Sequence, residues 1–196
     1  MGLGSLSATV FGAPTILVMG DSLSAAYGID PQQGWVALLQ ERLTRERYPH
    51  RIVNASISGD TTLGGRERLR AALERHRPEV VVLELGGNDG LRAISLEEIR
   101  ANLAALIRLS QRYQARVLLV GIRLPPNYGK RYTEGFHALY QELADKFAVP
   151  LVPFLLDGVA TQPGMMQPDG IHPTAAAQPR LVTNIWPYLA PLLGDS

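Results

Sequence analysis

Five apolar, strand-like runs alternate with amphipathic, helix-like segments along this chain. The runs lie at residues 15–19, 52–53, 80–85, 117–120 and 149–154. Strands separated by helices join through right-handed crossover connections, which makes neighbouring strands parallel and places helices on both faces of the sheet. The alternation therefore predicts an α/β fold, a doubly wound three-layer sandwich around a five-stranded parallel sheet.

The residue types within these segments refine the prediction. The run 80–85 is almost entirely apolar despite Glu84, which is typical of a central strand covered on both faces. Two prolines in 149–154 indicate a strand at the sheet edge, because proline lacks the N–H that pairs strands. Helices are expected at about 31–43, 69–76, 95–113, 132–147 and 173–192, with Pro173 at the start of the last helix and Pro187 kinking or breaking it.

Composition excludes several classes of function. The chain has 196 residues, no cysteine, and 19 Lys and Arg against 18 Asp and Glu. This near-neutral charge provides no general field for nucleic acid or an anionic membrane, and the lack of cysteine excludes disulfides and thiolate chemistry. No apolar run approaches the roughly 18–20 residues that cross a bilayer, so we predict no stable membrane insertion.

We expect a monomer with one domain at 14–194, and we interpret 1–13 as an N-terminal extension or cloning remnant outside it.

The other charged and metal-binding residue types give no sign of a further site. The arginines at 66, 68, 70, 75 and 77 are interrupted by Glu67 and Glu74, which predicts a solvated helix face rather than an anion-binding patch. The histidines at 50, 76 and 137 have no partner at the spacing of metal ligands, so we predict no metal site.

Four polar motifs directly follow strand-like runs or the short loops after them. Loops at the carboxyl ends of parallel strands share one edge of the sheet, where ligands bind near the point at which the strand order reverses. If the order is 2-1-3-4-5, that point lies between the first and third strands. The motifs are Gly20-Asp21-Ser22-Leu23-Ser24, Ser58-Gly59-Asp60, Gly86-Gly87-Asn88-Asp89 and Asp169-Gly170-Ile171-His172-Pro173.

Three residues of these motifs have the chemistry of a nucleophile, its base and an orienting acid. Ser22 follows the first strand, where a turn exposes its hydroxyl. Asp169 precedes His172 by three positions, so one short turn places its carboxylate against one imidazole nitrogen and leaves the other to face Ser22. A neutral imidazole takes the serine proton and returns it to the leaving group.

Two further residues supply candidate donors to an oxyanion. Gly59 offers a backbone N–H without a side chain in the way, and Asn88 offers a side-chain amide. Together with the N–H of Ser22, they form a three-donor oxyanion hole for acyl transfer.

Each of these residues also has an ordinary structural interpretation. A serine after a strand is usually a loop residue, and Ser22 lacks the G-x-S-x-G context of α/β-hydrolases. Asp169 alone is typical of a helix cap, and Gly59 and Asn88 alone are typical of turns. All of them fall on one predicted edge and supply every role that acyl transfer needs, which favours the catalytic interpretation.

The blocks GDSLS, SGD, GGND and DGIHP resemble those of the SGNH hydrolases, also called the GDSL esterase and lipase family. The similarity spans nearly the whole chain, and NASISGDTT, LELGGNDGLR and GMMQPDGIHP resemble a bacterial subgroup of multifunctional thioesterases, arylesterases and lysophospholipases. The resemblance implies a flavodoxin-like sandwich with Ser22 as nucleophile, His172 as base and Asp169 as its partner. It places Gly59 and Asn88 in the oxyanion hole.

The resemblance also implies properties that the residues alone do not indicate. Members of the subgroup use no metal or cofactor, and they commonly carry a cleaved signal peptide and work in the periplasm. A periplasmic or secreted location is therefore expected here, although residues 1–13 lack the basic region of an intact signal.

Two stretches resemble the mobile loops with which the family admits different acyl substrates, at 89–93 and 123–132. An ordinary turn-rich connection explains the second stretch equally well. Ala93 stands where subgroup relatives often have glycine, which leaves the chain-length preference open. The candidate substrate-binding residues are Asp89, Gly90, Leu91, Pro125, Asn127 and Tyr128.

These patterns predict a serine hydrolase that cleaves small-molecule acyl esters and thioesters through an acyl-enzyme on Ser22. Two alternatives stay open. A carbohydrate O-deacetylase uses the same four residue types with a pocket closed to chains longer than acetate. A non-catalytic flavodoxin-like binding module requires the motifs to be ordinary turn and loop residues.

Overall fold

A five-stranded, fully parallel sheet organises the structure, a computed structural model that describes residues 12–194. Its strands are β1 (Thr15–Gly20), β2 (Arg51–Asn54), β3 (Val80–Glu84), β4 (Arg116–Val120) and β5 (Leu151–Val152). The spatial order is β2-β1-β3-β4-β5, which confirms the predicted fold class and is the order on which the expected place of the site depended. Most of the N-terminal extension predicted at 1–13, residues 1–11, lies outside the described part of the chain.

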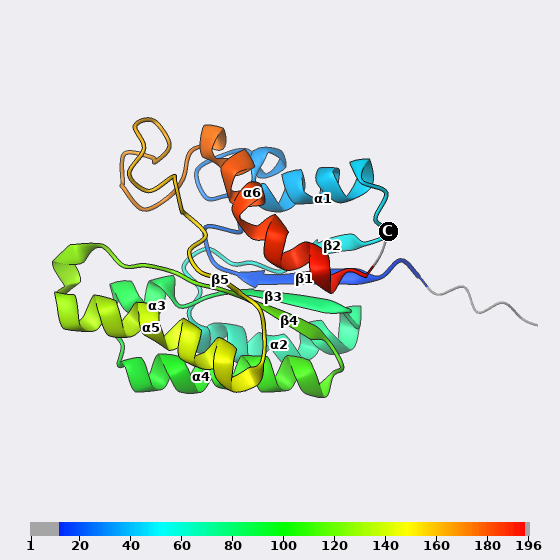
Figure 1. The fold of residues 1–196 in the computed structure, drawn as a ribbon, viewed down its shortest axis with the longest axis horizontal. Helices are drawn as coiled ribbons and strands as arrows, with labels where there is room; N and C mark the ends of the chain where they lie inside the picture. The colour runs from blue at the N-terminus through cyan, green and yellow to red at the C-terminus, as the bar shows by residue number, and fades with distance from the viewer. Residues whose placement is uncertain (1–11, 195–196) are drawn as a thin grey trace, which may run out of the picture.

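Helices cover both faces of the sheet because successive strand residues point to opposite faces. On one face, alternate residues of β1, β3 and β4 pack against α2 (Thr62–His76), α4 (Leu96–Arg112) and α5 (Lys130–Phe147). On the other face, the intervening residues pack against α1 (Trp35–Arg45) and α6 (Gln178–Leu189). Figure 1 shows these two layers on either side of the strands. None of the helices in residues 12–194 is long and apolar enough to cross a bilayer.

The predicted start of the last helix is wrong, and Pro187 does not break that helix. Pro173 does not begin a helix, because it pairs with Met166 in an antiparallel bridge. A short 3-10 turn at Ala175–Ala177 follows, and Pro179 then occupies the first turn of α6. Pro187 lies inside α6 without ending it, since the helix continues to Leu189 and passes into a 3-10 turn at Ala190–Leu192.

The short helix α3 (Gly87–Leu91), which sequence patterns did not predict, places Asn88 at the carboxyl end of β3. It begins after Gly86, whose φ of 117° is a left-handed conformation that other residues rarely adopt. The Tyr140 hydroxyl donates to the carbonyl of Leu85 and fills the space beside Gly86. The glycine therefore permits both the turn out of β3 and this close approach.

We expect Gly86→Ala to lower the free energy of unfolding by at least about 2 kcal/mol, because a methyl group there overlaps the Tyr140 hydroxyl and adds backbone strain. Urea unfolding measures the change. Gly164→Ala is the matched control, since Gly164 also has a positive φ of 77° but no atom lies within 4 Å of the added carbon. Equal losses from the two substitutions would contradict the packing argument.

Candidate active site

The turn after β1 presents Ser22 at the carboxyl end of the sheet. The Ala25 N–H donates to the carbonyl of Asp21 (2.9 Å), and the Leu23 N–H donates to the Asp21 carboxylate (3.0 Å). These bonds close a tight turn around Ser22, whose side chain is half-buried rather than exposed. The turn does not lead directly into a helix, because irregular turns continue to Gly28 and α1 begins only at Trp35.

A continuous chain of hydrogen bonds joins Ser22, His172 and Asp169. The Ser22 Oγ lies 2.8 Å from Nε2 of His172, although 150 positions separate the two residues. Nδ1 of His172 lies 2.7 Å from Oδ2 of Asp169. Since the carboxylate accepts the proton on Nδ1, Nε2 is left as the acceptor that faces the serine hydroxyl.

The Asp169 carboxylate is held in its charged form. Its Oδ1 accepts the backbone N–H groups of His172 (3.0 Å) and Ile171 (2.9 Å) in addition to the imidazole contact. These hydrogen bonds to the charged form, led by the N–H of His172, lower the pKa of Asp169 from 3.8 to about 2. The residue is therefore a fixed negative charge beside His172 near neutral pH.

Asn88, one of the predicted oxyanion donors, contacts the residues next to the other two, Ser22 and Gly59. Nδ2 of Asn88 donates to the backbone carbonyl of Asp60 (2.9 Å) and to Oδ2 of Asp21 (3.1 Å). Gly59, next to Asp60, adopts a φ of 80° and is exposed. Asn88 thus links the segments that carry Ser22 and Gly59, but both of its amide hydrogens already have acceptors, so donation to an oxyanion requires one of these bonds to be shared.

A buried pair of acidic residues lies beneath the turn that carries Ser22, the nucleophile turn (residues 21–28). Glu84, fully buried in β3, accepts from the Ser24 hydroxyl (2.7 Å) and more weakly from the Asp21 N–H (3.4 Å). Burial raises the pKa of Asp21 from 3.8 to about 6 and raises the pKa of Glu84 well above its usual value, where the neighbouring Asp21 charge adds to the effect. Asp21 therefore ionises near neutral pH, whereas burial and the neighbouring Asp21 charge both disfavour the charged form of Glu84.

An ion pair that the sequence interpretation missed anchors the Gly59 loop. The Arg68 guanidinium donates through Nε (2.8 Å) and Nη2 (2.6 Å) to Oδ2 of Asp60, and through Nη1 to the carbonyl of Ala55. Arg68 was grouped with the solvated arginines of the same helix, but its side chain is only 23% exposed. Nothing in the local charge pattern separates Arg68 from its neighbours, because the fold brings Asp60 to it.

The chain resembles known proteins over most of its length. A family described as GDSL-like Lipase/Acylhydrolase matches residues 18–179. The chain belongs to this GDSL-like family. Membership confirms the resemblance predicted from the motifs and does not favour a non-catalytic binding module.

Similar members of the GDSL-like family have names that describe acyl hydrolysis. Esterase TesA of Pseudomonas aeruginosa is 56% identical over 92% of this chain and 90% of its own. Thioesterase 1/protease 1/lysophospholipase L1 of Escherichia coli is 44% identical over 92% of this chain and 86% of its own. A crystal structure of TesA superimposes with a TM-score of 0.89 at 56% identity, covering 91% of this chain and 99% of that one.

The structure does not bring all of the predicted substrate-binding residues to the site. Asp89 is buried, and its carboxylate accepts from the backbone N–H (2.9 Å) and hydroxyl (2.5 Å) of Thr62 at the start of α2. Gly90 is also buried, and a side chain there would meet Leu124 and Phe136. Asp89 therefore caps a helix and Gly90 permits close packing, so neither presents a surface to a substrate.

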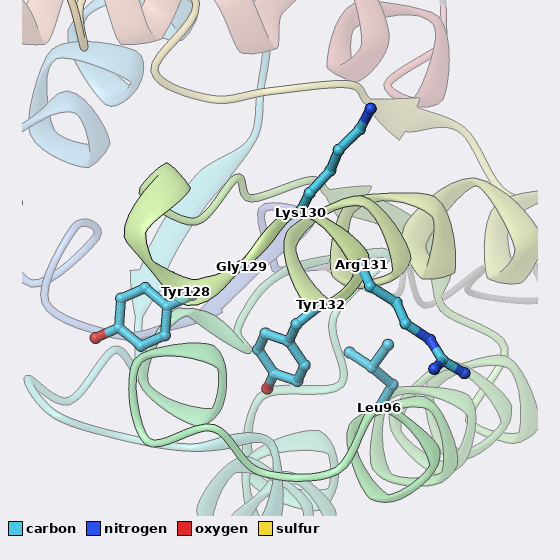
Figure 2. Close-up of a pocket in the computed structure, with 6 residues that line it drawn as sticks. All are labelled: Leu96, Tyr128, Gly129, Lys130, Arg131 and Tyr132. Carbon is cyan, nitrogen blue, oxygen red and sulfur yellow. The ribbon is translucent and has the colours of Figure 1, made fainter.

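Of the four remaining predicted substrate residues, one lines a surface cavity. The Tyr128 hydroxyl donates to the carbonyl of Leu91 (3.1 Å), and Pro125 and Asn127 are exposed. Tyr128 lines a cavity of about 430 Å³, together with Leu96, Lys130 and Tyr132 among others. Figure 2 shows Lys130 extending away from Tyr132 and Leu96. None of Ser22, His172 and Asp169 lines this cavity, so a role of the four predicted residues in substrate binding stays a prediction.

We expect the stability of the protein to fall as pH rises through about 6, because the folded state holds the Asp21 proton more tightly than the unfolded chain, whose pKa is 3.8. The penalty is absent below about pH 4 and complete above about pH 7, with a size on the order of 2–3 kcal/mol. Urea unfolding across this range measures the stability of wild type relative to Asp21→Asn, which should decline with pH.

Glu84→Gln serves as the control for this prediction. Glutamine removes the titratable carboxyl of Glu84 and keeps its size, so this variant should retain the decline relative to a double variant that also carries Asp21→Asn. A wild-type stability that stays constant relative to Asp21→Asn between about pH 4 and pH 7 would show that Asp21 does not carry the effect.

Proposed function

We propose that the protein is a serine hydrolase that cleaves carboxylic esters and acyl thioesters through an acyl-enzyme on Ser22. The observation that carries this proposal is the hydrogen-bonded chain from Ser22 through His172 to Asp169, assembled from segments 150 positions apart. Membership of the GDSL-like family and the names of the relatives support it. We further propose that residues 14–194 form a single hydrolase domain.

In the acylation step, Nε2 of His172 takes the Ser22 proton as Oγ attacks the substrate carbonyl. The carbonyl oxygen becomes an oxyanion, which the N–H groups of Ser22 and Gly59 and the amide of Asn88 stabilise. The charged Asp169 stabilises the imidazolium that forms. His172 then gives its proton to the departing alcohol or thiol, which leaves the acyl group as an ester on Oγ.

In the deacylation step, a water molecule takes the place of the leaving group. His172 removes a proton from this water as its oxygen attacks the acyl carbonyl, and the same donors stabilise the second oxyanion. Collapse of this intermediate releases the carboxylic acid and returns the proton to Oγ of Ser22. The two steps need no group beyond those of this chain and water.

The substrate class and the location are proposed by analogy with the relatives. Their names include arylesterase, thioesterase and lysophospholipase, so aryl esters, acyl thioesters and lysophospholipids are the substrates we propose. The resemblance to the bacterial subgroup supports a periplasmic location. A carbohydrate O-deacetylase differs from this proposal in accepting acetyl esters alone.

We expect Ser22→Ala to lower kcat/KM for p-nitrophenyl butyrate by about 10⁴-fold or more, because the variant has no nucleophile. A spectrophotometric assay of p-nitrophenolate release measures the loss. Ser95→Ala is the control, since it removes the cap of α4 at a cost of about 1 kcal/mol while leaving turnover unchanged. Similar rates for Ser22→Ala and wild type would remove Ser22 from the mechanism.

A common acyl-enzyme also predicts how products divide between water and an added alcohol. In the presence of methanol, a p-nitrophenyl ester and a thioester that carry the same acyl group should yield the same ratio of methyl ester to free acid. Both substrates form the same acyl-Ser22, and the division of this intermediate between water and methanol does not depend on which leaving group has departed. Gas chromatography measures the ratio, and different ratios would argue against a shared intermediate.

A further inference from the structure

The side chain of Gln167 joins the two loops that carry Ser22 and His172. Its Nε2 donates to the carbonyl of Tyr27 (2.8 Å) in the nucleophile turn and to the carbonyl of Pro173 (3.1 Å) beside His172. Its backbone N–H donates to the carbonyl of His172 (2.7 Å). One residue thus holds the base from its own loop and reaches across to the nucleophile turn.

The nucleophile turn is built to accept this side chain. Gly28, next to Tyr27, has a φ of 74°, and any side chain there would overlap the amide group of Gln167. The glycine leaves the space that the amide occupies. The Tyr27 ring lies over the imidazole of His172, with ring centroids 4.4 Å apart, so the same short segment contacts both the base and Gln167.

Few hydrogen bonds join the nucleophile turn to the loop that carries His172. Within residues 12–194, the hydrogen bonds that join residues 21–29 to residues 157–174 are the Gln167–Tyr27 bond and the Ser22–His172 bond. The bonds between Asp169 and His172 lie within one loop, so they orient the imidazole without fixing its distance from Ser22.

The Ser22–His172 hydrogen bond is absent during part of the reaction. This step of the inference rests on the proposed function. Before acylation, the serine hydroxyl donates to Nε2 and itself helps to hold the loops together. In the acyl-enzyme, Oγ is an ester oxygen with no hydrogen to donate, and Nε2 must instead accept a proton from the attacking water. The Gln167–Tyr27 bond is then the remaining hydrogen bond between the loops.

We propose that Gln167 is a positioning residue that acts chiefly in deacylation, by keeping His172 over the acylated Ser22 when their own hydrogen bond is absent. Acylation depends on Gln167 less, because the Ser22–His172 bond supports the same geometry in that step. Removing the amide therefore slows the second step more than the first and causes the acyl-enzyme to accumulate.

The test uses Gln167→Met, which preserves much of the side-chain volume but cannot donate a hydrogen bond. Rapid mixing with p-nitrophenyl butyrate separates the burst of p-nitrophenolate, which reports acylation, from the steady state. We expect deacylation to slow by about tenfold and acylation by less than about threefold. Intact-protein mass spectrometry after acid quenching should show a larger acylated fraction than in wild type.

Gln162→Met is the matched control, because Gln162 lies in the same loop with an exposed side chain. It should leave both steps and the acylated fraction unchanged. Gln167→Glu gives a second test that does not depend on the folding of the methionine variant. Its carboxylate faces the Tyr27 and Pro173 carbonyls without a donor, so it should also slow deacylation preferentially.

The outcomes separate this inference from the proposed function. Equal slowing of acylation and deacylation in both Gln167 variants, or an unchanged acylated fraction, would overturn the role of Gln167 while leaving the acyl-enzyme mechanism intact. Hydrolysis by Ser22→Ala at the wild-type rate would instead remove the acyl-enzyme, and the inference with it.

Discussion

The parallel pairing of β1 with β3 is the constraint on which the active site depends. In this register Gly20 lies opposite Glu84, so both strands end at the same level at the point where the strand order reverses. The turn that carries Ser22 and the helix that carries Asn88 therefore leave the sheet side by side. β2 lies on the other side of β1 and brings the Gly59 loop to the same edge.

This arrangement buries charge where the chemistry takes place. Asp21 and Glu84 lie beneath Ser22 with raised pKa values, and Asp21 accepts from the Asn88 amide. Arg68 pairs with Asp60 and holds the neighbouring loop. The donors around Ser22 are thus oriented by buried polar contacts, which resist rotation because breaking them leaves a charge or donor unpaired in a low dielectric.

The elements predicted correctly and those missed differ in what stabilises them. Strands and long helices follow from apolar periodicity, which is local, so these elements and the three-layer arrangement were predictable. The helix at Gly87–Leu91 contains two glycines and exists because Asp89 caps α2 and Gly86 turns the chain. Asp89 was assigned to substrate because the stretch 89–93 resembles a mobile substrate loop of the family, and the local sequence does not show its partner, Thr62.

The sequence by itself determined the layered α/β architecture and the residue types that meet at one edge. Tertiary structure decided which of those residues face the site: it aligned Ser22, His172 and Asp169, turned Asp89 and Gly90 inward, and joined Gln167 to Tyr27. The physical reason is the separation along the chain over which each kind of interaction acts. Periodicity and turn chemistry act over a few residues, whereas these contacts join residues far apart in the chain, whose partners exist only after the layers pack.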